Sequence, residues 1–127
     1  MQAIVVTPVK DALEATLETV QAISDAKGVY DYWVFNDYST DQTKAALETA
    51  SKAKGFKLIH LEDVTSNPSP NYKTVLQLSQ KSALEAGLPL IIVESDVKIN
   101  PDTLESLVNF SNANPNVGLV GAITQDA

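Results

Sequence analysis

The sequence predicts an α/β fold, a three-layer α/β/α sandwich around a mostly parallel sheet, and three observations predict it. Short apolar stretches alternate along the chain with longer stretches in which apolar residues recur at helical spacing. The short stretches are continuously apolar, which is typical of parallel strands that helices cover on both faces. The chain has 127 residues, of which 44% are hydrophobic, so it is long and apolar enough for a single domain with its own core.

The expected strands are short runs rich in β-branched, leucine and aromatic residues. Pro8 stops the first run, because proline has no N–H to donate to a sheet. Five strands are predicted in all, at residues 3–7, 32–35, 56–61, 90–93 and 117–120.

Four helices are expected between the strands, at residues 11–26, 41–54, 71–86 and 101–112. Thr40 or Asp41 can cap the second helix, and Asn100 followed by Pro101 is a good start for the fourth. A glycine follows each of the first three helices at a position that suits a left-handed C-terminal cap: Gly28, Gly55 and Gly87.

Charge and composition exclude several classes of protein. The chain has 9 basic and 16 acidic residues and a formal charge of -7, which argues against binding to nucleic acid or to an anionic membrane. The absence of cysteine rules out disulfides and favours a cytoplasmic location. The N-terminal residues lack the basic flank of a signal peptide, and no apolar run is long enough to span a membrane.

Acidic side chains follow two of the predicted strands. Asp37 ends the second strand, and Glu94 and Asp96 end the fourth. Ligands of parallel α/β sheets bind beyond the carboxyl ends of the strands, so these carboxylates are expected to face one crevice. Neighbouring carboxylates repel each other unless a cation or a donor-rich ligand is present. Oxygen ligands suit Mg²⁺ or Mn²⁺.

The polar segment after the second strand also has a purely structural interpretation. Ser39, Thr40 and Asp41 are expected to turn the chain and start the next helix, because their side chains accept from free backbone N–H groups. Asp37 and Asp96 are expected to be functional, because each lies at the end of an apolar strand.

The motifs in this order resemble those of family 2 glycosyltransferases, which have the Rossmann-like GT-A fold. The first strand and its Pro-Val, IVVTPV at residues 4–9, match the start of that family. NDYSTD at residues 36–41 is similar to its D-D-x-S-x-D motif. ESD at residues 94–96 looks like its D-x-D metal motif, and P-D-x-L follows at residues 101–104.

The resemblance implies a role for each matching residue. Thr7 and Pro8 would line the pocket of a nucleotide base, and Asp37 would accept a hydrogen bond from a uracil-type base. Glu94 would lie near the ribose, and Asp96 would hold Mn²⁺ or Mg²⁺ against the diphosphate. The implied function is the binding of a nucleotide-diphosphate sugar, most simply a UDP-sugar, for glycosyl transfer to an acceptor.

The chain departs from the family pattern in several places. Asn36 stands where the family has Asp, and Glu94 opens the acidic triplet with a longer side chain. SQKSA at residues 79–83 lacks the Arg, Asn and Gly of the A-R-N-x-G motif. In the family, the acceptor-binding half and the catalytic base lie beyond the part that these residues match. Residues 1–127 are therefore expected to be one nucleotide-sugar-binding domain from a longer enzyme, or a short relative without transfer activity.

The remaining candidate residues are interpreted as structural. Lys73 and Lys81 are expected on a solvated helix face, and His60 in the core or on an edge strand. Nucleotidylyltransferases and dinucleotide-binding domains need a glycine-rich loop after the first strand, and TPVKDALE has none. A phosphoacceptor signalling domain carries its acidic residues after different strands. The alternative that stays open is a non-catalytic α/β nucleotide-binding or interaction domain.

Overall fold

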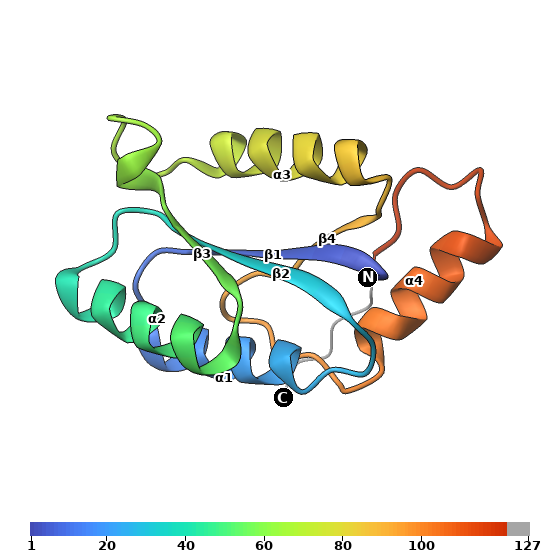
Figure 1. Cartoon of the computed structure of the whole chain (residues 1–127), viewed down its shortest axis with the longest axis horizontal. Helices are drawn as coiled ribbons and strands as arrows, with labels where there is room; N and C mark the ends of the chain where they lie inside the picture. The colour runs from blue at the N-terminus through green and yellow to red at the C-terminus, as the bar shows by residue number, and fades with distance from the viewer. Residues whose placement is uncertain (122–127) are drawn as a thin grey trace.

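The computed structural model describes residues 1–121, whose helices and strands alternate as the sequence predicts (Figure 1). A short 3₁₀ helix, η1, follows the third strand. The elements in chain order are β1 (Ala3–Val9), α1 (Leu13–Ser24), β2 (Tyr30–Asn36), α2 (Asp41–Lys54), β3 (Lys57–His60), η1 (Leu61–Asp63), α3 (Tyr72–Ala86), β4 (Leu90–Ile92) and α4 (Thr103–Ala113).

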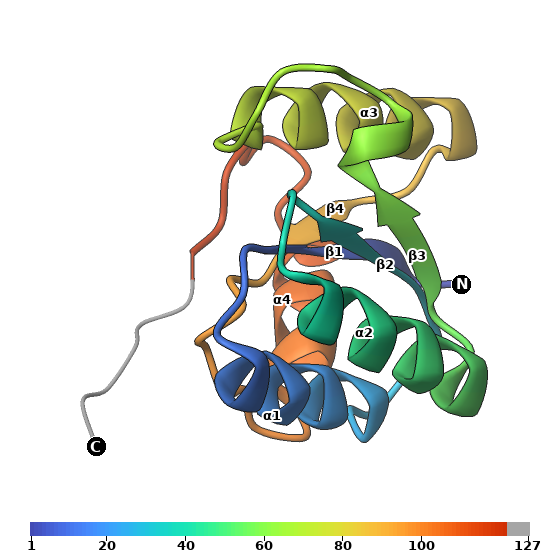
Figure 2. The ribbon, with the colours of Figure 1, turned by 90° about the vertical axis from the view of Figure 1, so that its left-hand side faces the viewer.

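The four strands form one parallel sheet in the order β3-β2-β1-β4. In the register of the sheet, Val6 of β1 lies between Trp33 of β2 and Ile92 of β4. This arrangement confirms the predicted α/β class and the parallel sheet. It also brings the carboxyl ends of all four strands to the same edge, which faces the viewer in Figure 2.

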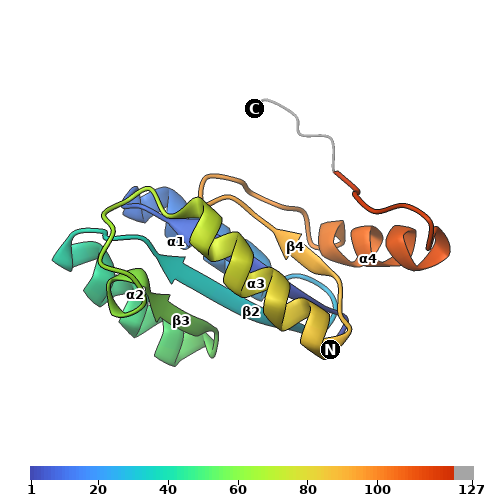
Figure 3. The same cartoon turned by 90° about the horizontal axis from the view of Figure 1, so that it is seen from above.

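Helices cover both faces of the sheet, so the predicted three layers are present. Figure 1 shows α3 above the sheet and α1 and α2 below it, and Figure 3 shows α3 lying over the sheet, roughly along the direction of its strands. Successive residues of a strand point to opposite faces, and β1 divides its side chains in this way between two cores. The lower core holds Val5, Val9, Val20, Val34, Leu47 and Leu104. The upper core, under α3, holds Ile4, Val6, Phe35, Leu61, Val75 and Ala83.

The predicted fifth strand is not formed. Residues 117–120 have no regular structure, and Leu119 is 90% exposed. An apolar, β-branched run becomes a strand only when a neighbouring strand takes up its backbone groups, and none pairs with it within residues 1–121. In the same described part of the chain, no helix is both long enough and apolar enough to cross a membrane.

Helix α1 starts two residues later than the sequence predicts. Asp11 and Ala12 have φ values of 53° and 51°, the left-handed region that non-glycine residues rarely adopt. These two residues therefore turn the chain between β1 and α1 instead of forming the first helical turn. Tyr38, after β2, has a φ of 59°. All three left-handed residues lie at the carboxyl edge of the sheet, where strained backbone often accompanies function.

Candidate functional site

The site begins with Asp37, which is buried at the carboxyl end of β2 with 7% of its surface exposed. Its Oδ2 accepts hydrogen bonds from Ser69 Oγ and from the backbone N–H of Asn71, both at 2.8 Å. Its Oδ1 accepts from Asn71 Nδ2 at 2.9 Å. An ionised carboxylate has about four acceptor positions, so these three donors leave about one for a ligand.

The side chains of Asn36 and Thr40, on either side of the turn after Asp37, accept hydrogen bonds from its backbone and that of α2. Asn36 Oδ1 accepts from the backbone N–H of Ser39 at 3.2 Å. Thr40 is the N-cap of α2, and its Oγ1 accepts from the N–H of Thr43. Asp41 is the first residue inside the helix. Of the two caps that the sequence allows, the structure uses Thr40.

Asp11 joins this turn to the one after β1, a role that sequence reasoning missed. Its Oδ1 accepts from the backbone N–H of Thr40 at 2.8 Å and from Thr43 Oγ1 at 3.2 Å. The hydrogen bond from the Thr40 N–H is the main reason that the pKa of Asp11 is lowered. The backbone N–H of Asp11 in turn donates to Ser39 Oγ at 2.9 Å. No local pattern signals these contacts, because their partners are 28 or more positions away.

Thr7 and Pro8, the two residues expected around a base, lie on opposite faces of the sheet. Thr7 is fully buried, and its Oγ1 accepts from Tyr32 Oη at 2.9 Å. Burial raises the pKa of Tyr32 above its usual range, so the phenol stays neutral and donates this bond. Pro8 is partly exposed. Of the two, only Pro8 offers its side chain to the surface, and Thr7 supports it from within the core.

Glu94 and Asp96 are exposed in the turn after β4. Tyr72, the first residue of α3, donates its hydroxyl to Glu94 Oε1 at 3.2 Å. The pKa of Tyr72 is raised, first by partial burial and then by the Glu94 charge. Thr19 of α1 holds the same turn from below, because its hydroxyl lies 2.9 Å from the Ser95 carbonyl and 2.8 Å from that of Val97. No local sequence pattern signals this role of Thr19, because its partners lie 76 and 78 positions away.

These acidic residues fit part of a site for a hard cation. Two carboxylates, spaced two residues apart in an exposed turn, offer the oxygen ligands that Mg²⁺ or Mn²⁺ prefers. Within residues 1–121, however, no cluster of three or more acidic, histidine or cysteine side chains is placed to hold a metal. A cation at Asp96 would therefore take its other ligands from water and from a bound phosphate.

The other residues considered from the sequence fall outside the site. His60 ends β3, which is an edge strand as expected. Lys73 and Lys81 are exposed on α3. This matches their interpretation as a solvated face.

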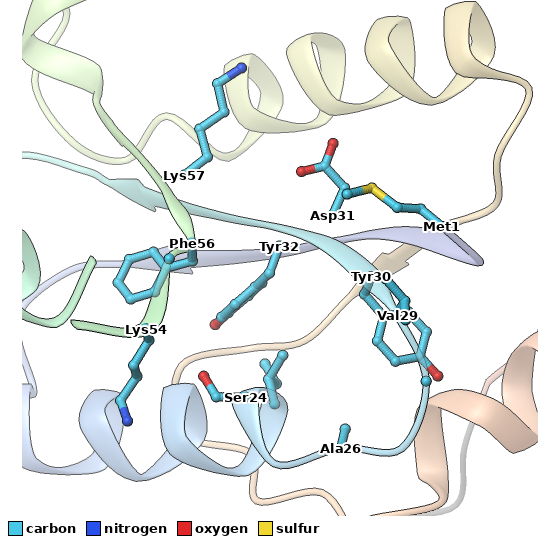
Figure 4. A pocket seen from close by; sticks show the side chains of 13 residues that line it. Met1, Ser24, Ala26, Val29, Tyr30, Asp31, Tyr32, Lys54, Phe56 and Lys57 are labelled. Atoms are coloured by element: carbon cyan, nitrogen blue, oxygen red, sulfur yellow. The ribbon is translucent and has the colours of Figure 1, made fainter. Parts of the chain in front are cut away.

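A hollow of about 400 Å³ lies at the opposite edge of the sheet, near the amino ends of β2 and β3 (Figure 4). Tyr30, Tyr32 and Phe56 contribute aromatic rings to its wall. The Tyr30 hydroxyl donates to the Lys27 carbonyl at 2.7 Å, and Lys54 Nζ bonds Gln21. The Tyr30 hydroxyl and the Lys54 ammonium at this hollow are thus paired within the chain.

Comparison with known proteins identifies the family of the chain. Residues 4–126 match the family described as glycosyl transferase family 2. The chain belongs to this family. The predicted resemblance to this family is therefore confirmed over nearly the whole chain. A search of curated protein sequences gives no match.

Solved structures of other glycosyltransferases have the same fold as this chain. TarS 1–349 from S. aureus, in complex with UDP-GlcNAc, is 21% identical with a TM-score of 0.65 and covers 91% of the chain. The mannosyltransferase PcManGT from Pyrobaculum calidifontis, in complex with GDP-Man and Mn²⁺, is 18% identical with a TM-score of 0.76 and covers 98%. The chain spans only 32% and 36% of the lengths of those two proteins.

Proposed function

We propose that the chain is the donor-binding part of a glycosyltransferase and binds a nucleotide-diphosphate sugar together with a divalent cation. The observation that carries this proposal is that Asp37, Glu94 and Asp96 follow parallel strands at one edge of the sheet. Membership of glycosyl transferase family 2 supports it. So do the UDP-GlcNAc complex of TarS and the GDP-Man and Mn²⁺ complex of PcManGT.

Asp37 is proposed to read the base, and its hydrogen bonds favour uracil. Three protein donors already occupy the carboxylate, which leaves about one acceptor position. Uracil offers one imide N–H at its pairing edge, whereas guanine offers both an N–H and an amino group. A single acceptor position therefore suits a UDP-sugar better than a GDP-sugar. Pro8 would contact the base, and Thr7 would hold the end of β1 in place through Tyr32.

Glu94 and Asp96 are proposed to bind the rest of the nucleotide. The Glu94 carboxylate is exposed and can accept from ribose hydroxyls, with Tyr72 orienting it. Asp96 would hold Mn²⁺ or Mg²⁺, which usually retains waters and relies on substrate phosphates for other ligands. When bound, the cation would neutralise the charge that develops on the departing diphosphate.

We propose that residues 1–127 form one domain, and that the acceptor site and catalytic base belong to another part of a longer protein, since the chain spans about a third of TarS and PcManGT. The proposed compartment is the cytoplasm, because the chain contains no cysteine. The alternative is a non-catalytic domain that binds nucleotides or a partner protein.

Calorimetry with UDP, GDP and ADP, each with and without Mn²⁺, tests the proposal. We expect UDP to bind more tightly than GDP by about tenfold, which corresponds to one charge-assisted hydrogen bond. ADP should bind most weakly, and Mn²⁺ should strengthen every interaction. An interaction domain without a nucleotide site would bind none of the three. Equal affinity for UDP and ADP would contradict the role of Asp37 as a reader of the base.

A further inference from the structure

A hydrogen-bond network of His60, the Asn36 amide and the Ser39 N–H links β3 to the turn beside Asp37. His60 Nδ1 lies 3.0 Å from Asn36 Nδ2. Asn36 Oδ1 accepts from the backbone N–H of Ser39 at 3.2 Å. On its other side, His60 Nε2 lies 3.1 Å from Glu48 Oε1 of α2. The imidazole therefore connects α2, β2 and the turn that leads away from the candidate site.

The donors and acceptors of this network determine which imidazole nitrogen of His60 carries the proton. A backbone N–H can only donate, so the Asn36 atom that faces Ser39 must be the amide oxygen. The amino group of Asn36 then faces His60 Nδ1, which must accept. In the neutral ring the proton is consequently on Nε2, where it points toward the acceptor oxygen of Glu48.

We infer that His60 is a positioning residue, which as the Nε2–H tautomer holds the Asn36 amide in the orientation that closes the turn beside Asp37. Asn36 is only 2% exposed, so water cannot readily replace either of its partners. If its amide rotated, its amino group would face the half-buried N–H of Ser39, and both donors would lose their acceptors at considerable cost. His60 opposes this rotation because Glu48 accepts the Nε2 proton: moving the proton to Nδ1 would set the Nε2 lone pair against a carboxylate oxygen.

This arrangement also accounts for the asparagine of NDYSTD. The carboxylate of an Asp at position 36 would accept from Ser39 but would have no hydrogen to donate to His60 Nδ1. Asn is the residue that satisfies both neighbours, because it donates and accepts at once. The inference depends on the proposed function only in its last step, where the turn presents Asp37 to a nucleotide.

The first test needs no nucleotide, and it is direct because His60 is the only histidine. Long-range ¹H–¹⁵N correlation spectra of the ring at pH 8 should show a protonated Nε2 and an unprotonated Nδ1. In Asn36→Asp, the new carboxylate faces Nδ1, so Nδ1 should become protonated. An Nδ1–H tautomer in the wild-type chain, or no change of the ring in Asn36→Asp, would overturn the inference.

A matched pair of substitutions tests the positioning role. In His60→Asn, the side-chain amide reaches as far as Nδ1 did, so its oxygen can still accept from Asn36. In His60→Gln, the amide reaches as far as Nε2 did and keeps the contact with Glu48 instead. We expect the Ser39 amide to exchange with solvent near the wild-type rate in His60→Asn and at least about fivefold faster in His60→Gln, the factor expected for one lost hydrogen bond. Equal rates in the two variants would overturn the positioning role.

Measuring UDP affinity in the same two variants tests whether the turn acts on a bound nucleotide. His60→Gln should bind UDP about fivefold more weakly than His60→Asn. If the Ser39 exchange rates differ as expected and the UDP affinities do not, His60 positions the turn but the turn does not act on the nucleotide, which overturns that step alone. If the wild-type chain binds no nucleotide, the proposed function fails, and the tautomer and exchange measurements still decide the role of His60.

Discussion

Asn71 gives Asp37 two hydrogen bonds, one from its backbone N–H to Oδ2 at 2.8 Å and one from its side-chain amide to Oδ1 at 2.9 Å. Both residues are buried, and they lie 34 positions apart in the sequence. Asp37 therefore holds the start of α3 against the end of β2. The same carboxylate that is proposed to read a base also has a structural task, and experiments on it must separate the two.

Replacing Asp37 by Asn should lower both stability and nucleotide affinity. The substitution sets an amino group against one of the donors from Ser69 or Asn71 and removes the charge that strengthens the other bonds. We expect the free energy of unfolding to fall by about 2–3 kcal/mol, as for a lost bond to a buried charged group. Urea unfolding should show this as a lower midpoint with an unchanged slope. UDP affinity, measured on the folded protein, should fall about tenfold or more.

Two control variants separate anchoring from base reading. Asn71→Ala removes the side-chain bonds to Asp37 Oδ1 and to the Asn67 carbonyl but leaves the Asp37 carboxylate, so it should cost about 2–3 kcal/mol of stability and little UDP affinity. Asp41→Asn should change both quantities little, because Thr40 caps the helix. A loss of UDP affinity in Asn71→Ala as large as that in Asp37→Asn would mean that Asp37 acts only as an anchor.

Asp96 should control the binding of a cation together with the nucleotide. Asp96→Ala is expected to weaken UDP-dependent Mn²⁺ binding by at least about tenfold, because it removes the proposed protein ligand. Asp25→Asn, which removes one exposed charge after α1, is the matched control and should leave Mn²⁺ binding unchanged. Calorimetric titration of Mn²⁺ in the presence of saturating UDP measures both. Equal weakening in the two variants would reduce the role of Asp96 to its contribution to net charge.

Tyr72→Phe should affect ligand binding more than stability. Tyr72 is 43% exposed, and the substitution keeps its ring and removes only the hydroxyl that donates to Glu94 at 3.2 Å. We expect the free energy of unfolding to change by less than about 0.5 kcal/mol, as for most surface substitutions. UDP affinity should fall about threefold, because Glu94 loses the bond that orients it. Parallel urea unfolding and calorimetry decide between this result and a mainly structural role for the hydroxyl.

Asp11 should make stability depend on pH under acidic conditions. The pKa of Asp11 in the folded chain lies below the ordinary value of an aspartate, chiefly because the Thr40 N–H donates to the carboxylate. A lowered folded pKa means that the stabilisation is present above the unfolded pKa and is lost as the pH falls through the folded value. Asp11→Asn should therefore lose less stability than the wild-type chain between pH 5 and pH 2.5. Urea midpoints across this range measure the difference, and parallel curves would contradict it.

The sequence alone predicted most of the fold because the relevant signals are local. Continuous apolar runs and helical spacing specify strands and helices, and buried parallel strands require helices on both faces. Thr40, Gly55 and Gly87 act as caps within a few residues of the groups they satisfy. The edge on which Asp37, Glu94 and Asp96 lie also follows from the order of elements, because parallel strands end at the same side. Their proposed roles toward a nucleotide stay predictions.

Only the tertiary structure decided which side chains meet at that edge. The bonds from Asn71 to Asp37, from Thr40 to Asp11 and between Asn36 and His60 join residues 24 or more positions apart. The side chain of Thr7 lies in the core rather than in a crevice, and residues 117–120 remain without a strand partner in the described chain. Local propensity sets what each segment can form, but hydrogen bonding of buried polar groups depends on which donors and acceptors the folded chain brings within about 3 Å.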